Sequence, residues 1–93
     1  GFLTIELKII QPNNRVKFSV FQKAWNLRHA IAGAPVYILV GGLAKGHVKL
    51  FHGAWTEHLG QKTVDQVPGL YEGRLEDMDL RQIVPNSQTP QCV

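Results

Sequence analysis

Hydrophobic and polar residues alternate along residues 2–10, and β-branched side chains are frequent there. The segment contains no glycine or proline, so its pattern is typical of a β-strand. Because successive strand side chains point to opposite faces, we expect Glu6 and Lys8 to lie side by side on one face. The other face should be apolar and should comprise Leu3, Ile5, Leu7 and Ile9.

A helical pattern follows a turn at residues 11–14, which contains a proline and two asparagines. Ser19 and Gln22 have the spacing of a capping box, in which each side chain bonds to the backbone of the other residue. Gly33 and Pro35 mark the end of the pattern. The sequence therefore predicts a helix with a buried apolar stripe, formed by Val20, Ala24, Leu27 and Ile31 and widened by Phe21 and Trp25.

Two further strands are predicted after this helix. Residues 36–40 are almost wholly apolar, as in a buried strand, and residues 47–51 alternate as an edge strand does. The order strand, helix, strand predicts that the first two strands run parallel. Lys45 and Lys49 should be solvated residues that protect the edge from further pairing.

The remaining chain has weaker patterns. Residues 55–59 predict a short helical turn, residues 75–84 predict a helix, and the last nine residues resemble a loose tail. We therefore expect one α/β domain over residues 1–93. Its core should span about residues 2–59, with an irregular extension at residues 60–93.

Charge is unevenly distributed along the chain. The net charge is +3, but residues 1–62 carry eight basic and two acidic residues, whereas residues 63–93 carry two basic and five acidic residues. A polyanion such as nucleic acid is a reasonable partner for the basic part, and an ordinary scatter of surface charge is the competing explanation.

The sequence also bears on the compartment. It has no apolar run near the roughly 18 residues that span a bilayer and no secretory leader pattern. The single cysteine, Cys92, has no partner for an internal disulfide. We expect a cytoplasmic protein without a membrane partner, in the host cell if the chain is viral.

The Glu6–Lys8 pair has two interpretations. As a surface ion pair it would contribute under about 1 kcal/mol and would need no function. As part of a site, a carboxylate would bind a hard cation while the ammonium offsets developing negative charge. Gln22 also has two interpretations. It has either a role in that site or only its role in the capping box.

Several segments together resemble a known family. They are TIELK at residues 4–8, RVKF at 15–18, the S-x-x-Q helix start, and AWNLRHAIAGAPVYILV at 24–40. This combination is similar to the C-terminal half of a PD-(D/E)XK nuclease core, closest to phage-type and VRR-type members and to Holliday-junction resolvases. The resemblance covers about residues 2–51. It implies a restriction-endonuclease-like core, with a mixed sheet and flanking helices, that hydrolyses DNA.

The resemblance also implies a role for each matching residue. Glu6 and the backbone carbonyl of Leu7 would bind Mg²⁺, which Mn²⁺ can replace. Lys8 would orient the attacking water or offset phosphate charge, and Gln22 would reach toward the same site from the helix. The residues that contact DNA backbone phosphates would be Arg15, Lys17 and Lys23.

One part of the family pattern is absent. The family's metal-binding Asp lies on a hairpin before the Glu-x-Lys strand, and this sequence begins five residues before Glu6. We favour a missing first half supplied by another segment or polypeptide, and a homodimer is also expected. The alternatives are a permuted order that uses Asp65, Asp77 or Asp79, or a non-catalytic nucleic-acid-binding module or subunit of a split nuclease. An interaction domain without a nucleic-acid role is a further class.

Overall fold

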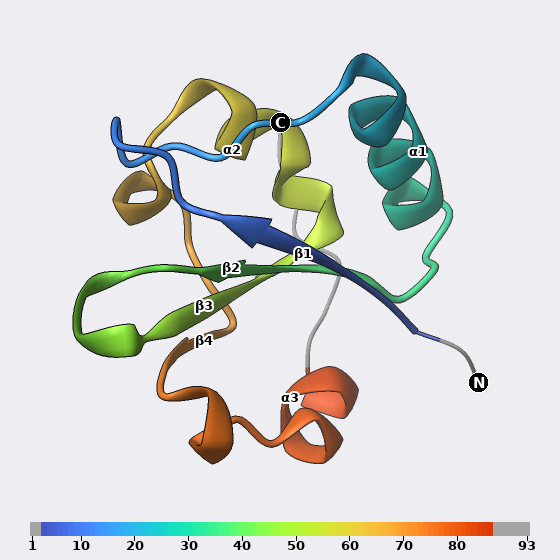
Figure 1. The fold of residues 1–93 in the computed structure, drawn as a ribbon. Coiled ribbons are helices and arrows are strands. Elements are labelled where there is room, and N and C mark those ends of the chain that lie inside the picture. The colour runs from blue at the N-terminus through green and yellow to red at the C-terminus, as the bar shows by residue number, and fades with distance from the viewer. Residues whose placement is uncertain (1–2, 87–93) are drawn as a thin grey trace.

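The computed structural model describes residues 3–86, which form a four-stranded sheet with helices on both faces (Figure 1). The strand order is β1-β2-β3-β4. β1 runs parallel to β2, whereas the β2/β3 and β3/β4 pairs are antiparallel. The predicted α/β class, mixed sheet and parallel first pair are therefore confirmed. The strands are β1 (Thr4–Ile9), β2 (Val36–Gly41), β3 (Val48–His52) and β4 (Tyr71–Gly73).

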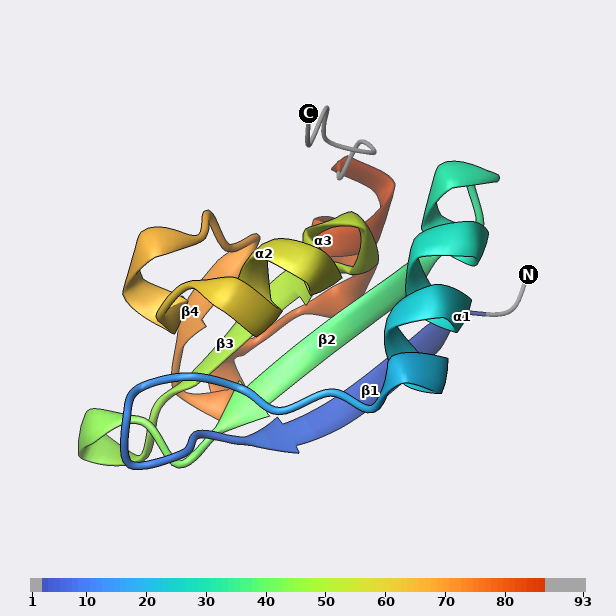
Figure 2. The same cartoon turned by 90° about the horizontal axis from the view of Figure 1, so that it is seen from above.

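The helices form two layers, one on each side of the sheet (Figures 1 and 2). The upper layer holds α1 (Val20–Ile31), η2 (Gly53–Trp55) and α2 (Thr56–Gln61). The lower layer holds η4 (Leu75–Asp77) and α3 (Leu80–Asn86). Two short turns, η1 (Ala44–Gly46) and η3 (Val64–Gln66), lie in the loops. α1 follows β1 and precedes β2, so it forms the crossover of the predicted βαβ unit.

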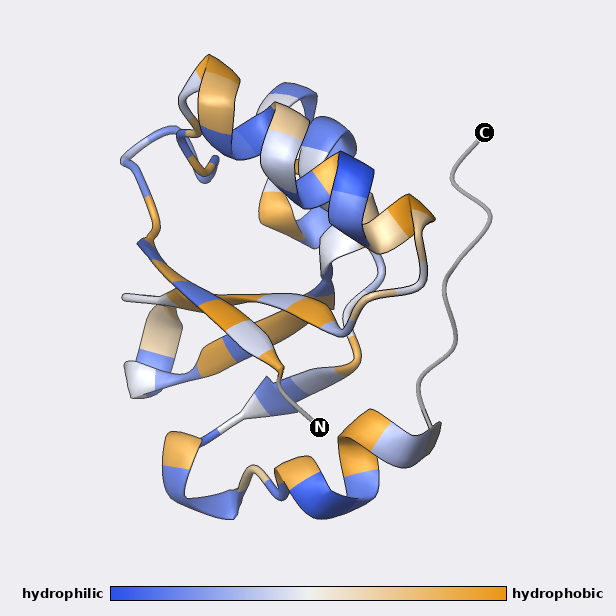
Figure 3. Cartoon of the chain, turned by 90° about the vertical axis from the view of Figure 1, so that its right-hand side faces the viewer, coloured by the Kyte–Doolittle hydropathy of each residue, from blue (hydrophilic) through white to orange (hydrophobic). Residues whose placement is uncertain are grey.

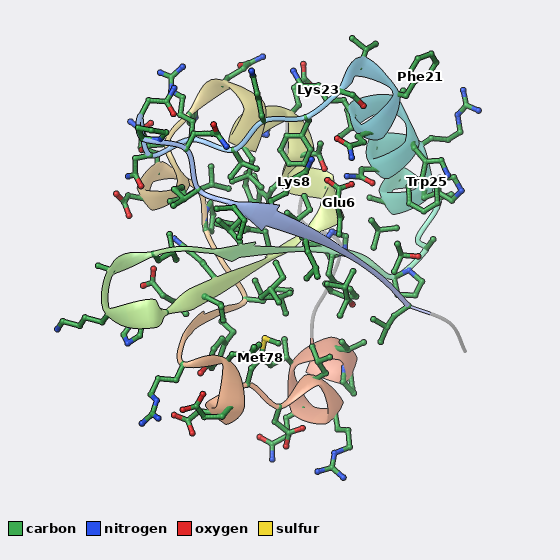
Figure 4. The ribbon with its side chains drawn as sticks, in the orientation of Figure 1. Glu6, Lys8, Phe21, Lys23, Trp25 and Met78 are labelled. Carbon is green, nitrogen blue, oxygen red and sulfur yellow. The ribbon has the colours of Figure 1, made fainter. Side chains whose placement is uncertain are left out.

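The main hydrophobic core lies between the upper layer and the centre of the sheet. Ile38 of β2 and Phe51 of β3 are adjacent in the register and fully buried there. Their neighbours in this core are Val16, Val40, Leu59, Val64 and Val67. On the lower face, Leu50 is also fully buried, and Met78 lies between this face and the lower helices (Figure 4).

The predicted edge strand is an interior strand. β3 pairs with β4, which is only three residues long and therefore shows no periodic pattern in the sequence. Lys49 is correspondingly not a solvated edge residue, because its Nζ donates to the Val64 carbonyl at 3.0 Å. Lys45 is exposed in the turn η1, as expected.

The C-terminal helical prediction is confirmed only in part. Residues 75–84 form two pieces, η4 and α3, separated at Met78 and Asp79. α3 includes Pro85 and Asn86, which were predicted as part of a loose tail, and the rest of that predicted tail, residues 87–93, lies outside the described residues. The helical turn predicted at 55–59 is present within η2 and α2.

The prediction of a buried apolar stripe on α1 is wrong, and the apolar face of β1 is not buried either. The apolar face of β1 is largely exposed, with Leu7 73% and Ile9 68% accessible. On α1, Val20 is 81% and Phe21 86% accessible. Ala24, Trp25 and Ile31 are exposed too, and Leu27 is half-buried. Figure 3 shows the hydrophobic parts of β1 and α1 in orange.

The reversal has a physical cause. Glu6 and Lys8 point from β1 toward α1, so the helix above them must offer hydrogen-bonding groups rather than apolar ones (Figure 4). α1 accordingly turns its side with Asn26 and Ala30 inward, and its apolar side faces outward. The helix itself begins as predicted, with Ser19 as its N-cap.

Candidate functional site

Glu6 and Lys8, both on β1, form an ion pair. The pair lies in the space between β1 and α1. Lys8 Nζ lies 3.3 Å from Glu6 Oε2, and the two side chains are only 18% (Glu6) and 16% (Lys8) exposed. They share one face because they lie two positions apart on the strand. Lys8 Nζ also lies 5.0 Å from the centroid of the Phe18 ring. The pair is therefore held in a partly desolvated place, where charges interact more strongly than on an open surface.

α1 completes a polar cluster, which we define as Glu6, Lys8, Gln22 and Asn26. Lys8 Nζ donates to Gln22 Oε1 at 2.9 Å, and Asn26 Nδ2 donates to Glu6 Oε1 at 3.3 Å. Gln22 and Asn26 are four residues apart, so they lie on one side of the helix. The structure thus brings the three predicted catalytic residues together.

Sequence reasoning missed Asn26, which is 2% exposed. Its spacing of four from Gln22 was a usable signal, because it places an amide one turn further along the side of the helix that faces Glu6. The sequence pattern instead predicted that the apolar stripe, and not the side with Asn26, is buried.

Gln22 completes the predicted capping box and also contacts Lys8. Its Oε1 accepts from the Ser19 backbone N–H at 3.1 Å, and its own N–H donates to Ser19 Oγ at 3.0 Å. The capping box therefore fixes the side chain whose oxygen also accepts from Lys8.

One carboxylate oxygen in the cluster retains capacity for a ligand. Within the described part of the chain, Glu6 Oε2 is buried and has no hydrogen-bond donor, although Lys8 contacts it as an ion pair. Glu6 also lines an open pocket of about 280 Å³ between β1 and α1. The other lining residues are Thr4, Phe21, Gln22, Trp25 and Asn26. A carboxylate oxygen without a hydrogen bond keeps lone pairs that can bind a cation or accept from a ligand.

Leu7 was predicted to offer its backbone carbonyl to the same metal. Thr4 N donates to Pro35 O at 2.9 Å, and Ile10 N donates to Gly41 O at 3.0 Å, so the even-numbered residues of β1 bond to β2. The N–H and C=O groups of Leu7 consequently point to the outer edge of the sheet. This carbonyl is thus available at the edge, while the Leu7 side chain projects away from α1.

A second carboxylate is not part of the cluster. Across residues 3–86, no group of three or more His, Cys, Asp or Glu side chains could hold a metal ion. Asp77 and Asp79 belong to the η4–α3 region on the opposite face of the sheet (Figure 1). Asp65 accepts a hydrogen bond from Asn14, in the turn after β1. Among residues 3–86, the polar cluster therefore contains one carboxylate, that of Glu6.

The predicted DNA-contacting residues lie beside the start of α1. Arg15 and Lys17 are exposed and border a shallow pocket of about 460 Å³ that also includes Gly60. Lys23 is half-buried, and a Cβ placed on Gly60 would lie 3.0 Å from its Nζ. Lys23 lies on the same side of the sheet as Glu6 and Lys8 (Figure 4).

Phe21 and Trp25 were expected to belong to the core, and they instead form the exposed rim of the Glu6 pocket. Trp25 stacks on His29, with ring centroids 3.9 Å apart and planes inclined by 23°. Two aromatic side chains therefore line this pocket together with the polar residues.

No helix among residues 3–86 is long and apolar enough to cross a membrane.

The chain was compared with known protein families, proteins and structures. No protein-family model, no curated protein and no solved structure matches the chain.

Proposed function

We propose that the chain contributes half of a metal-dependent nuclease site, which hydrolyses DNA phosphodiester bonds. The single observation that supports this most is the arrangement around Glu6. Glu6 lines a pocket and has a buried carboxylate oxygen without a hydrogen bond, while a lysine held by Gln22 lies 3.3 Å from that oxygen. A restriction-endonuclease-like core is the corresponding proposal for the fold.

Each residue has a defined task in this proposal. Glu6 Oε2 and the Leu7 carbonyl are hard oxygen ligands suited to Mg²⁺ or Mn²⁺. The bound ion supplies polarisation of the phosphate and a lower pKa for an attacking water. Lys8 offsets the negative charge that develops on the scissile phosphate. Gln22 positions Lys8, because their 2.9 Å hydrogen bond fixes the ammonium beside Glu6.

The site needs a second carboxylate from outside the cluster. One carboxylate and one carbonyl are few protein ligands for a catalytic divalent cation. β1 is an edge strand, so a neighbouring segment or chain can approach Glu6 along it. DNA would be held by phosphate contacts from Arg15, Lys17 and Lys23, without sequence readout.

A second candidate function is a non-catalytic nucleic-acid-binding module or a subunit of a split nuclease. The observation that favours it is the pairing already present, since Glu6 contacts both Lys8 and Asn26. A charge that is satisfied within the chain does not require a metal. The basic residues before and within α1 would bind phosphates in either case.

The test is incubation of the protein with branched, nicked and linear DNA plus Mg²⁺ or Mn²⁺. We expect cleavage that Glu6→Gln abolishes, whereas Glu57→Gln retains it, because Glu57 is an exposed acid on α2. Cleavage that survives Glu6→Gln contradicts the site assignment. DNA binding without cleavage, with affinity that falls steeply as salt rises, supports the binding module instead.

A further inference from the structure

Among residues 3–86, no strand pairs with the outer edge of β1. β1 is the first strand in the sheet order, and Figure 2 shows no described helix or strand along its outer side. The alternation established above directs the backbone groups of Ile5, Leu7 and Ile9 to this edge. The Ile9 carbonyl accepts a long 3.4 Å bond from the Gln11 side chain. Such a row of free donors and acceptors is a template for another strand.

The side chains of β1 do not block this edge. Exposed edge strands usually carry a charge, a proline or a bulge that prevents pairing. The two charged residues of β1, Glu6 and Lys8, are turned toward α1 and bonded there. On the opposite face, Leu7 and Ile9 are exposed apolar residues.

We propose that β1 pairs with β1 of a second copy, in antiparallel orientation, about a two-fold axis at Leu7. The second copy is the occupant because the strand is complementary to itself in one register. That register follows from hydrogen bonding and charge.

Hydrogen bonding restricts the registers. In an antiparallel pair, two facing residues exchange both backbone bonds, or neither. Only the odd-numbered residues of β1 direct these groups outward, so an odd-numbered residue must face an odd-numbered one. The two-fold axis therefore lies at a residue and not between two residues.

Charge then selects one register. With the axis at Leu7, Glu6 faces Lys8 of the second copy, and this ion pair occurs twice. With the axis at Glu6, the two Glu6 carboxylates face each other, and with the axis at Lys8 the two ammonium groups do. With the axis at Ile5 or Ile9, neither Glu6 nor Lys8 faces a charged residue, so no ion pair forms. Like charges directly opposite one another destabilise strand pairing, whereas opposite charges stabilise it.

The apolar residues agree with this register. Leu7 faces Leu7 of the second copy, and Ile5 faces Ile9 in both directions. These cross-strand pairs lie on the face away from α1, where Leu7 and Ile9 are now exposed. Each such apolar contact adds to the stability of the pair.

The dimer also provides a second carboxylate. The two Glu6 side chains become diagonal neighbours on one face, with Cβ atoms about 7–8 Å apart. Two flexible carboxylates at that separation can approach the same divalent cation. This consequence rests on the proposed function, whereas the strand pairing itself does not depend on it.

Cysteine crosslinking tests the register in the full chain with Cys92→Ser. Leu7→Cys should form a disulfide dimer under a mild oxidant, because a facing, hydrogen-bonded pair has Cα atoms about 5.5 Å apart. Ile5→Cys and Ile9→Cys should not crosslink alone, since each faces the other residue and lies about 14 Å from its own copy. A mixture of the two variants should crosslink. Failure of Leu7→Cys, or efficient crosslinking of Ile9→Cys alone, overturns the inference.

Molecular mass in solution provides an independent test. Leu7→Pro removes only an outward N–H, a place where an edge strand tolerates proline. By light scattering at high micromolar concentration, we expect a dimer for the unaltered chain and for Val20→Lys, whose side chain is exposed on α1. We expect a monomer for Leu7→Pro, with unchanged circular dichroism.

The outcomes separate this inference from the proposed function. A monomeric unaltered chain overturns the strand pairing, whatever its activity. A crosslinked dimer that neither binds Mn²⁺ nor cleaves DNA supports the pairing and contradicts the nuclease. Cleavage by a monomer leaves the nuclease standing, with a different source for the second carboxylate.

Discussion

Lys8 Nζ lies 2.9 Å from Gln22 Oε1, so the glutamine of the capping box of α1 also holds the lysine of β1. The two residues are 14 positions apart in the chain. A local helix-start motif and a long-range contact therefore depend on one amide oxygen. This coupling ties the polar cluster to the start of the helix.

Removal of the Gln22 amide should destabilise the fold. Gln22→Ala loses the reciprocal half of the capping box and leaves Lys8 with fewer acceptors, so we expect a loss of about 1–2 kcal/mol in unfolding free energy. Gln22→Glu is the matched control, because a glutamate also completes a capping box and can accept from Lys8. Urea denaturation measures both. Equal stability of Gln22→Ala and the unaltered chain would contradict the coupling.

Asn26→Asp should create a divalent-cation site. The substitution replaces the amide that donates to Glu6 with a second carboxylate, so two acids then share a partly buried place. Without metal we expect a loss of about 1–3 kcal/mol. Mn²⁺ should restore much of this stability, because a ligand that binds the folded state stabilises it.

The readout for Asn26→Asp is the melting temperature with and without Mn²⁺. Asn26→Ala is the control, since it also removes the hydrogen bond to Glu6 but adds no acid. A rise with Mn²⁺ in both variants, or in neither, would show that the added carboxylate does not act with Glu6.

Stability should fall at acidic pH because of His52. Burial lowers the pKa of His52 below its usual 6.5, and its Nδ1 accepts from the Ala54 N–H at 3.0 Å. The unfolded chain therefore binds this proton more readily than the folded chain does. Its contribution to stability is complete above pH 6.5 and is lost as the pH falls toward the folded-state pKa.

Unfolding free energies between pH 7.5 and 5 test this prediction. His52→Asn retains a side-chain acceptor near the Ala54 N–H but does not titrate, so its stability should depend less on pH in this interval. An unchanged slope in His52→Asn would assign the pH dependence to other groups.

The exposure of α1 predicts a contrast between two phenylalanines. Phe21 is 86% accessible, so Phe21→Ala should change the unfolding free energy by no more than about 0.5 kcal/mol. Phe51 is fully buried, and Phe51→Ala should cost about 3–5 kcal/mol. Thermal denaturation of the monomeric Leu7→Pro chain gives the comparison without dimer contacts. A large loss for Phe21→Ala would mean that this side of α1 is covered.

Features that depend on near neighbours were predictable from the sequence. The alternation of β1 placed Glu6 beside Lys8, and the Ser19 to Gln22 spacing located the start of α1. The order of strand, helix and apolar strand predicted the parallel pair. Each rests on backbone geometry repeated over a few residues, which the sequence pattern reports directly.

Other features required the tertiary structure. Periodicity tells which residues share a face of an element, but it does not tell which face packs against the rest of the protein. Glu6 and Lys8 lie under α1, where they need donors and acceptors, so Gln22 and Asn26 turn inward and Phe21 turns outward. The pairing of β3 with the three-residue β4 likewise depends on a partner about 20 residues away. The sequence determined the local elements, and the need to satisfy partly buried charges decided their orientation.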